Sequence, residues 1–202
     1  ELKNTVCLIK GDKAFLSQHV GDLKNLSAYD FFCRTIDHLQ RILDIRPTAI
    51  AHDLHPDYLS TRYAMERTDL PQIPVQHHHA HIVSCMTEHR IDGPVVGLAF
   101  DGTGYGSDGT IWGGEFLIAE ARRFHRIAHL TPIPMPGAAA AVKEPWRMAL
   151  AYLYDAYGKD LYDLDIPFVK NLPRARCDVI LGMIDNSVNA PLTSSLGRLF
   201  DG

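Results

Sequence analysis

Histidines are concentrated in one short segment of this chain. The sequence has 202 residues and 11 histidines, and residues 76–81 read Gln-His-His-His-Ala-His. On a helix, His77 and His81 stand one turn apart and share a face, with Cβ atoms about 5–6 Å apart. Two imidazoles at that spacing can bind one divalent ion, whereas His78 and His79 point to other sides of the helix. Such a pair also arises by coincidence, so it does not establish a metal site alone.

Two histidines leave the coordination of a metal unfilled, and Asp101 is the natural candidate for a further, carboxylate ligand. It follows residues 94–100, an apolar run that reads as a strand buried on both faces. We therefore expect Asp101 at the C-terminal end of a buried strand. His77, His81 and Asp101 together predict a divalent metal site, although these ligand types do not separate zinc from iron or manganese.

A glycine-rich segment begins directly at Asp101. Residues 101–109 read Asp-Gly-Thr-Gly-Tyr-Gly-Ser-Asp-Gly and contain the pattern GxGxxG. The dinucleotide-binding fingerprint requires a helix after the glycines, whereas residues 110–120 have the pattern of a strand, and no Walker sequence is present. We therefore expect a strand–turn–strand hairpin. It is either a plain β-turn or a cradle whose bare backbone amides bind phosphate.

Apolar periodicity predicts the elements that position these residues. Further strands are expected at residues 5–10, 14–19, 48–51, 74–75 and 124–130, and helices at residues 28–45, 57–67, 77–89 and 145–157. This order predicts an α/β class with mixed sheets. We place a boundary between two lobes at residues 91–94, which gives domains of residues 1–92 and 93–202.

Composition and charge exclude several classes of protein. Hydrophobic residues make up 46% and charged residues 22% of the chain, as in ordinary globular proteins. The formal charge of −4 leaves no basic excess for general nucleic-acid binding. No apolar run is long enough for a membrane span. The widely spaced cysteines are expected to be reduced thiols of a cytoplasmic protein, with Cys85 in the core.

Five segments in combination resemble one known family. They are AHDLHPDYLST (51–61), VQHHHAH (75–81), LAFDGTGYGSDGTIWGG (98–114), KEPWRMA (143–149) and TSSLGRLFD (193–201). The family is the HypF-type carbamoyltransferases of nickel–iron hydrogenase maturation, whose C-terminal region is similar to the tRNA-threonylcarbamoyl transferases. The resemblance covers essentially the whole chain. It implies an actin-like ATPase fold, with a first ribonuclease-H-like lobe and an incomplete second lobe.

The resemblance also implies an activity and a set of partners. An upstream domain would convert carbamoyl phosphate and ATP to carbamoyl-adenylate. This domain would then transfer the carbamoyl group to the C-terminal cysteine of a HypE-type acceptor protein, on the route to the cyanide ligand of the iron. By position, the matching metal ligands are His77, His81 and Asp101, and the matching nucleotide-binding residues are Gly102, Thr103, Gly104 and Gly106.

The chain departs from the family in its extent. The upstream domains are missing and the chain stops inside the last motif, so we expect a piece of a longer enzyme that is insufficient for the reaction alone. No catalytic residue is assigned within it, because the partner supplies the nucleophile. Two alternatives stay open: a tRNA-modifying relative, which the acidic balance disfavours, and a non-catalytic metal-binding or interaction module.

Overall fold

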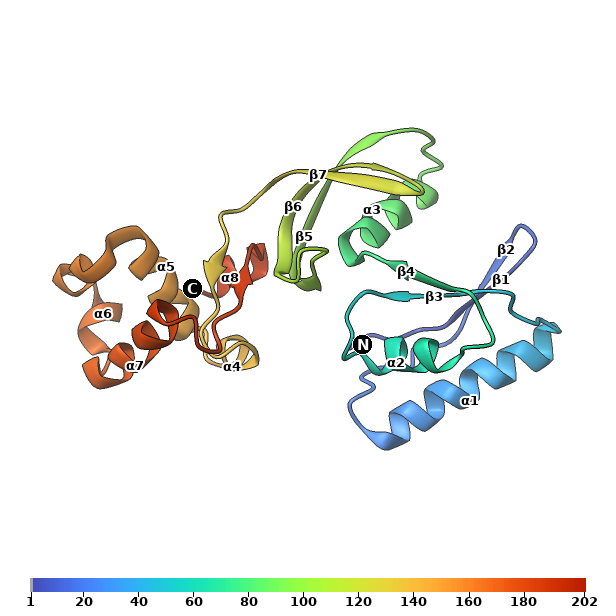
Figure 1. The fold of residues 1–202 in the computed structure, drawn as a ribbon, viewed down its shortest axis with the longest axis horizontal. Coiled ribbons are helices and arrows are strands. Elements are labelled where there is room, and N and C mark those ends of the chain that lie inside the picture. Colours follow the sequence, from blue (N-terminus) through green and yellow to red (C-terminus); the bar gives the residue numbers. More distant parts are fainter. Residues whose placement is uncertain (1) are drawn as a thin grey trace. The chain divides into compact units, whose positions relative to one another are not determined.

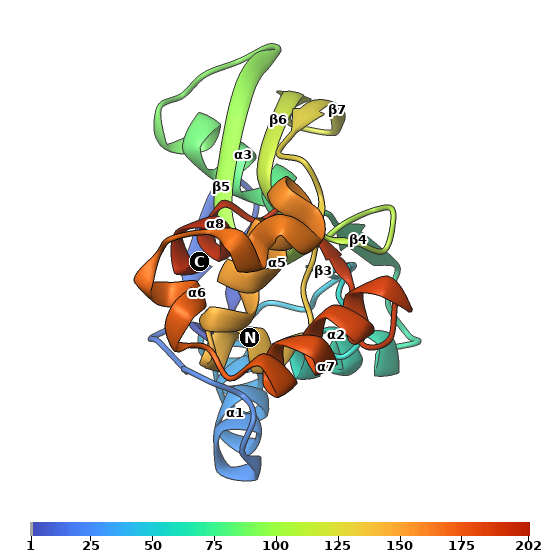
Figure 2. The same cartoon turned by 90° about the vertical axis from the view of Figure 1, so that its left-hand side faces the viewer.

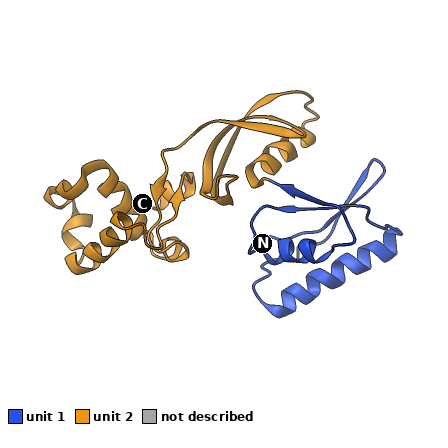
Figure 3. Cartoon of the chain, viewed as in Figure 1, with its two compact units in different colours: residues 1–75 blue, residues 76–202 orange. Residues whose placement is uncertain are grey.

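The computed structural model describes residues 2–202 and divides into two compact units, residues 1–75 and residues 76–202 (Figure 3). Figure 1 shows the helices and strands in chain order. Each unit has its own strands and its own apolar core. Among the described residues, no helix combines the length and the apolar character that crossing a membrane requires.

Unit 1, residues 1–75, combines two helices with two pairs of strands. Its elements are β1 (Cys7–Lys10), β2 (Lys13–Leu16), α1 (Leu26–Leu43), β3 (Ile50–Asp53), α2 (Leu59–Glu66) and β4 (Gln72–Val75). β1 pairs antiparallel with β2, and β3 pairs parallel with β4. The side chain of Asn25 caps α1, which packs Phe32 and Ile36 against Leu23. The strands and helices predicted here are confirmed, with ends shifted by a few residues.

Unit 2, residues 76–202, contains a five-stranded sheet and a group of helices. Its strands are β5 (Val95–Tyr105), β6 (Ile111–Glu120), β7 (Arg123–His129), β8 (Ile133–Pro134) and β9 (Leu192–Thr193). Its α-helices are α3 (His77–Glu88), α4 (Ala139–Lys143), α5 (Trp146–Tyr157), α6 (Pro167–Asn171), α7 (Arg174–Asp185) and α8 (Leu196–Asp201). The sheet order is β5-β6-β9-β8, and β7 also pairs with β6.

The helix that carries the histidines packs on the sheet of unit 2. Ile82 and Met86 of α3 join Trp112 and Leu117 of β6 in one buried cluster. Gly97 allows this approach, because a carbon at its Cβ position would lie 2.4 Å from Ile82 Cδ1. α3 therefore belongs by its contacts to unit 2. The predicted boundary at residues 91–94, with domains 1–92 and 93–202, refers to the two lobes of the fold and not to these compact units. It stays a prediction.

The expectation that residues 94–100 form a strand buried on both faces is wrong. Within β5, Val96, Leu98 and Phe100 are 64%, 55% and 51% exposed, whereas Gly97 and Ala99 are buried. The sequence is apolar throughout, but β5 pairs antiparallel with β6 and α3 packs against the alternate residues only. Asp101 also does not end the strand, since β5 continues to Tyr105.

The helices after residue 138 form a second core in unit 2. Figure 2 shows α5, α6 and α7 gathered together. α5 and α7 bury Leu150, Cys177 and Ile180 in one cluster. The predicted helix at residues 145–157 is confirmed as α5, and Pro145 stands at its N-cap. Sequence periodicity missed α4, α6, α7 and α8, of which α7 is the longest and the others have five or six residues.

Candidate functional site

A helix cap and a β-bulge bring the predicted ligands together. The side chain of Gln76 accepts the backbone N–H of His79 at 2.9 Å and so starts α3 at His77. On the sheet, the pairing of β5 with β6 is regular up to Phe100 and resumes at Gly104, so residues 101–103 form a bulge. A bulge redirects a side chain from the alternation of its strand, and here the redirected residue is Asp101.

The three predicted metal ligands converge on one another. His77 Nε2 lies 3.1 Å from Asp101 Oδ2, and His81 Nε2 lies 3.6 Å from the same oxygen. The Nε2 atoms of His77 and His81 are 3.2 Å apart. All the candidate ligand atoms lie within 4.8 Å of one another. The helical spacing therefore produces the shared face that was predicted, and two imidazoles with a carboxylate form a donor set that suits zinc or iron.

Burial and hydrogen bonds set the protonation states of Asp101 and His78. Burial by itself would raise the pKa of Asp101, but hydrogen bonds from His77, His81 and the Gly102 N–H hold that pKa well below its usual range. Burial, and next the neighbouring His77, lowers the pKa of His78 to about 4. At neutral pH Asp101 is therefore an ionised acceptor and His78 a neutral ring beside it.

The glycine-rich segment forms the predicted hairpin, and the amides of two of its glycines are hydrogen-bonded within it. The Gly102 N–H donates to Asp101 Oδ1 at 2.6 Å, and the Gly106 N–H donates to Thr110 O at 2.9 Å. Of the two alternatives for this hairpin, the cradle of bare amides does not describe these two glycines, because the bulge and the turn use their amides internally. Thr103 is exposed at the bulge, directly after Asp101 and Gly102.

Gly104 serves close packing between the hairpin and α3. A carbon at its Cβ position would lie 2.4 Å from His78 Cε1 and 3.0 Å from His77 Cδ2. Distances below 3.0 Å between such atoms require something to move. Glycine at this position therefore lets the hairpin approach the histidines, a steric role that the motif alone does not reveal.

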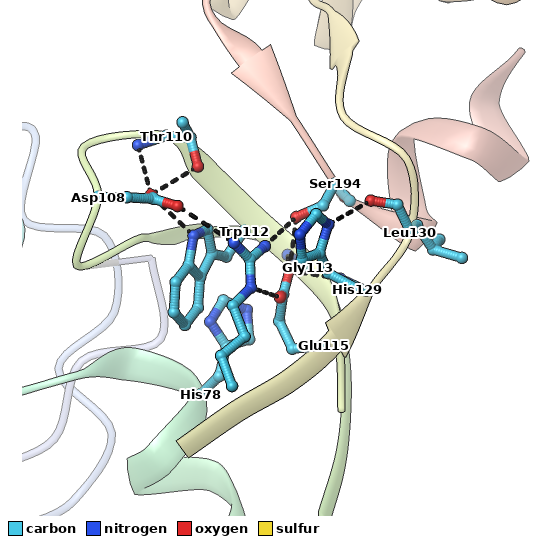
Figure 4. Close-up of polar contacts among 12 residues, drawn as sticks. His78, Asp108, Thr110, Trp112, Gly113, Glu115, His129, Leu130 and Ser194 are labelled. Carbon is cyan, nitrogen blue, oxygen red and sulfur yellow. Dashed lines mark hydrogen bonds and ion pairs between the residues drawn. The ribbon is translucent and has the colours of Figure 1, made fainter. Parts of the chain in front are cut away.

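A buried carboxylate behind the hairpin was not predicted. Glu115 is 0% exposed, and it accepts the N–H groups of Gly113 and Gly114 and the Ser194 hydroxyl. Figure 4 shows Gly113 and Ser194 beside its carboxylate. Arg126 Nε lies 2.6 Å from Glu115 Oε2. Burial favours the neutral form, but the bond from Arg126 is foremost among those that lower the pKa of Glu115. Glu115 is the one charged residue of the run at 111–119, and that was the available signal.

Arg126 connects this carboxylate to the tip of the hairpin. Its Nη1 lies 3.1 Å from Asp108 Oδ2, and its guanidinium lies 4.0 Å from the centre of the Trp112 ring. Trp112 Nε1 donates to the other oxygen of Asp108 at 2.9 Å. Arg126 of β7 therefore contacts both Glu115 and Trp112 of β6 and Asp108 in the turn that closes the glycine hairpin.

The segment at residues 193–201 is seated on the same hairpin. Ser195 Oγ lies 2.7 Å from Asp101 O and 2.9 Å from Gly102 O. A carbon at the Cβ position of Gly197 would lie 2.7 Å from Gly102 Cα, so the two backbones touch. A stretch about 90 residues further along the chain is thus part of the site, which local sequence patterns did not indicate.

Cys85 does not lie in the core, and that prediction is wrong. The residue is exposed, with Sγ 3.8 Å from His89 Nδ1. α3 buries only the face that carries Ile82 and Met86, and Cys85 falls outside it. The thiol therefore stands on the open face of the histidine helix.

Two family models match the chain. The model of the HypF Kae1-like domain matches residues 1–88, and the model of the carbamoyltransferase Kae1-like domain, second subdomain, matches residues 97–202. Carbamoyltransferase HypF2 of Cupriavidus necator is 46% identical over 202 residues, which cover 98% of this chain and 24% of the relative. Carbamoyltransferase HypF of Rhizobium leguminosarum bv. viciae is 45% identical over 201 residues, covering 100% and 26%. The chain thus spans about a quarter of these relatives.

Solved structures agree with these matches. A crystal structure of full-length HypF in a phosphate- and nucleotide-bound form matches 99% of this chain and 26% of that one, with a TM-score of 0.92 and 45% identity. The crystal structure of HypF from T. kodakarensis matches 100% and 28%, with a TM-score of 0.88 and 33% identity. The predicted α/β class and the actin-like fold of Kae1-like domains are confirmed.

Proposed function

This chain belongs to the HypF family of carbamoyltransferases, and from that membership we propose that it supplies the carbamoyl-transfer site of a longer enzyme. The reaction would move the carbamoyl group of carbamoyl-adenylate to the C-terminal cysteine of a HypE-type acceptor protein. Carbamoyl phosphate and ATP would enter through another domain of the enzyme. The observation that carries the proposal is the meeting of His77, His81 and Asp101 at the start of the glycine hairpin.

The side chains present fit a divalent ion. His77, His81 and Asp101 offer two imidazole nitrogens and one carboxylate oxygen, a set that leaves further coordination positions for a ligand. A bound ion would supply positive charge to the phosphate that leaves in the reaction. The proposed metal is zinc or iron. The hydrogen bond from Gly102 and the packing of Gly104 hold the carboxylate and the imidazoles in place before any ligand arrives.

The rest of the hairpin would orient the nucleotide. The exposed residue at the bulge is Thr103, so its hydroxyl and amide are the groups best placed to donate to a phosphate oxygen. The thiolate of the acceptor would attack the carbamoyl carbon. A C–S bond forms, the bond from that carbon to the phosphate oxygen breaks, and AMP leaves with the electron pair. In this proposed reaction, no thiol of this chain takes part in the transfer.

The product would then continue toward the cyanide ligand of a nickel–iron hydrogenase. Because the acceptor thiol must stay reduced until it is carbamoylated, we place the reaction in the cytoplasm. The curated relatives are named as carbamoyltransferases, which favours this function over the tRNA-modifying and non-catalytic alternatives.

The test uses the full-length enzyme with Asp101→Ala and His77→Ala. Both variants are expected to lose bound divalent metal and to carbamoylate the acceptor at least about tenfold more slowly, since even supporting groups of a metal site are worth 10- to 100-fold. His89→Ala is the matched control, because His89 caps the C-terminal end of the same helix, at the end opposite to His77 and His81. Metal content is measured by elemental analysis and carbamoylation by mass spectrometry. Undiminished transfer in both variants would contradict the proposal.

A further inference from the structure

The proposed function gives no role to Arg198, a charged residue of the segment at residues 193–201. Arg198 lies on α8, and its side chain is 12% exposed. Its Nη1 lies 2.9 Å from Asp201 Oδ2. Nevertheless, Nε and Nη1 are buried and have no hydrogen-bond partner among residues 2–202. The guanidinium is thus paired with one carboxylate, while its buried Nε and Nη1 make no hydrogen bond within the described part of the chain.

The third nitrogen of Arg198 points to the hairpin. A carbon at the Cβ position of Gly102 would lie 3.4 Å from Arg198 Nη2. The position is held by the backbone, because Ser195 Oγ accepts the Arg198 N–H at 3.2 Å and also contacts Asp101 O and Gly102 O. Gly197 also packs closely on Gly102, since a carbon at its Cβ position would lie 2.7 Å from Gly102 Cα.

A cation in such a place is costly unless an anion completes its environment. Burial of a charge without full pairing is unfavourable, and a guanidinium has five N–H donors in a fixed fork. Asp201 satisfies this requirement on one side only, and Asp201 Oδ2 is itself buried without a hydrogen bond among the described residues. The planar fork matches the oxygens of a phosphate group.

We propose that Arg198 is a phosphate-binding residue, which holds an oxygen of a phosphate group beside Gly102 on the side of the hairpin that begins at Asp101. The inference rests on the proposed function, in which a phosphate is the leaving group. The shared chemistry is a phosphate oxyanion, and it can come from inorganic phosphate or from a nucleotide. A merely structural role, as the partner of Asp201, is the competing explanation.

The experiment titrates the full-length enzyme with inorganic phosphate, AMP and adenosine at one low ionic strength and follows the Gly102 amide by NMR. We expect phosphate and AMP, but not adenosine, to shift this resonance. Arg198→Gln is expected to weaken the binding of phosphate and of AMP by about ten- to hundredfold. This is the loss of affinity that corresponds to one hydrogen bond to a charged group. Tighter binding of AMP than of phosphate identifies a nucleotide as the source, and equal binding identifies free phosphate.

Two further variants keep the test decisive if Arg198→Gln does not fold. Arg198→Lys retains the charge without the fork and should weaken binding less. Asp201→Asn removes the competing carboxylate and should strengthen phosphate binding, whereas a purely structural pair predicts no gain. The matched control is Arg123→Gln, an exposed arginine paired with Glu120 on the same sheet.

The proposal is overturned if phosphate and AMP do not shift the amide, or if the folded Arg198→Gln binds them as tightly as wild type. It is also overturned if Arg123→Gln weakens binding equally, since the effect would then be general charge. These outcomes leave the Asp101→Ala test untouched. Carbamoyl transfer that depends on Asp101 together with phosphate affinity that ignores Arg198 would sink this inference alone.

Discussion

Replacement of Glu115 by glutamine should strongly destabilise unit 2. The carboxylate is 0% exposed and receives four hydrogen bonds, from two backbone amides, the Ser194 hydroxyl and Arg126. Glutamine keeps the shape and one acceptor oxygen but turns an NH2 group toward Arg126. Breaking a buried ion pair costs about 3–5 kcal/mol. Because Arg126 is 18% exposed and keeps Asp108, we expect about 3 kcal/mol.

The measurement is urea unfolding followed by tryptophan fluorescence. Trp112 lies under the Arg126 guanidinium and so reports this region directly. The matched control is Glu120→Gln, which removes the exposed partner of Arg123 from the same pair of strands and should change stability little. For a unit of this size, 3 kcal/mol corresponds to a fall in Tm of roughly 10–15 °C.

The same variant should change how stability depends on pH. The folded-state pKa of Glu115 is lowered, so its contribution is fully present above the unfolded value of about 4.3 and is lost as pH falls through the folded value. The stability difference between wild type and Glu115→Gln should therefore shrink below about pH 4. The reasoning is refuted if Glu115→Gln costs no more than Glu120→Gln, or if the difference grows on acidification.

Three other substitutions test the packing arguments. Gly104→Ala places a carbon 2.4 Å from His78 Cε1, and it should cost about 1–3 kcal/mol in unfolding experiments and reduce metal binding measured by titration. Gly182→Ala, in the interior of α7 with open space around it, should instead stabilise the chain by about 0.5–1 kcal/mol in the same assay, and any loss would contradict its open surroundings. Asn25→Ala removes the cap of α1 and should cost about 1 kcal/mol, seen as lower helical ellipticity on heating, while Asn25→Asp should retain the cap.

Much of the fold could be predicted from local periodicity. The amphipathic helix α1 and the antiparallel hairpins are formed by residues that are close together in the chain. Turn residues and apolar spacing therefore identify them. Elements of two to six residues, such as β8 and α8, carry too few residues for any period to show. The exposed face of β5 also escaped prediction, because an apolar run does not state which neighbours will cover it.

The metal-site prediction illustrates which parts of a site a sequence contains. The spacing of His77 and His81 is a helical property, and it determined that the two rings would meet. The choice of Asp101 required the assumption that a strand end lies near that helix. The structure brings the three together by a bulge within β5 instead, because the register with β6 shifts there.

By itself, the sequence determined the kinds of donor at the site, their helical spacing and the glycine hairpin, since these depend on residues within one turn or one loop. Only the tertiary structure decided that Glu115 and Arg126 support the hairpin from behind and that Arg198 meets Gly102 from the far end of the chain. The reason is physical. Contacts between distant segments depend on strand order and on which faces are buried, and both are settled by the packing of the whole unit.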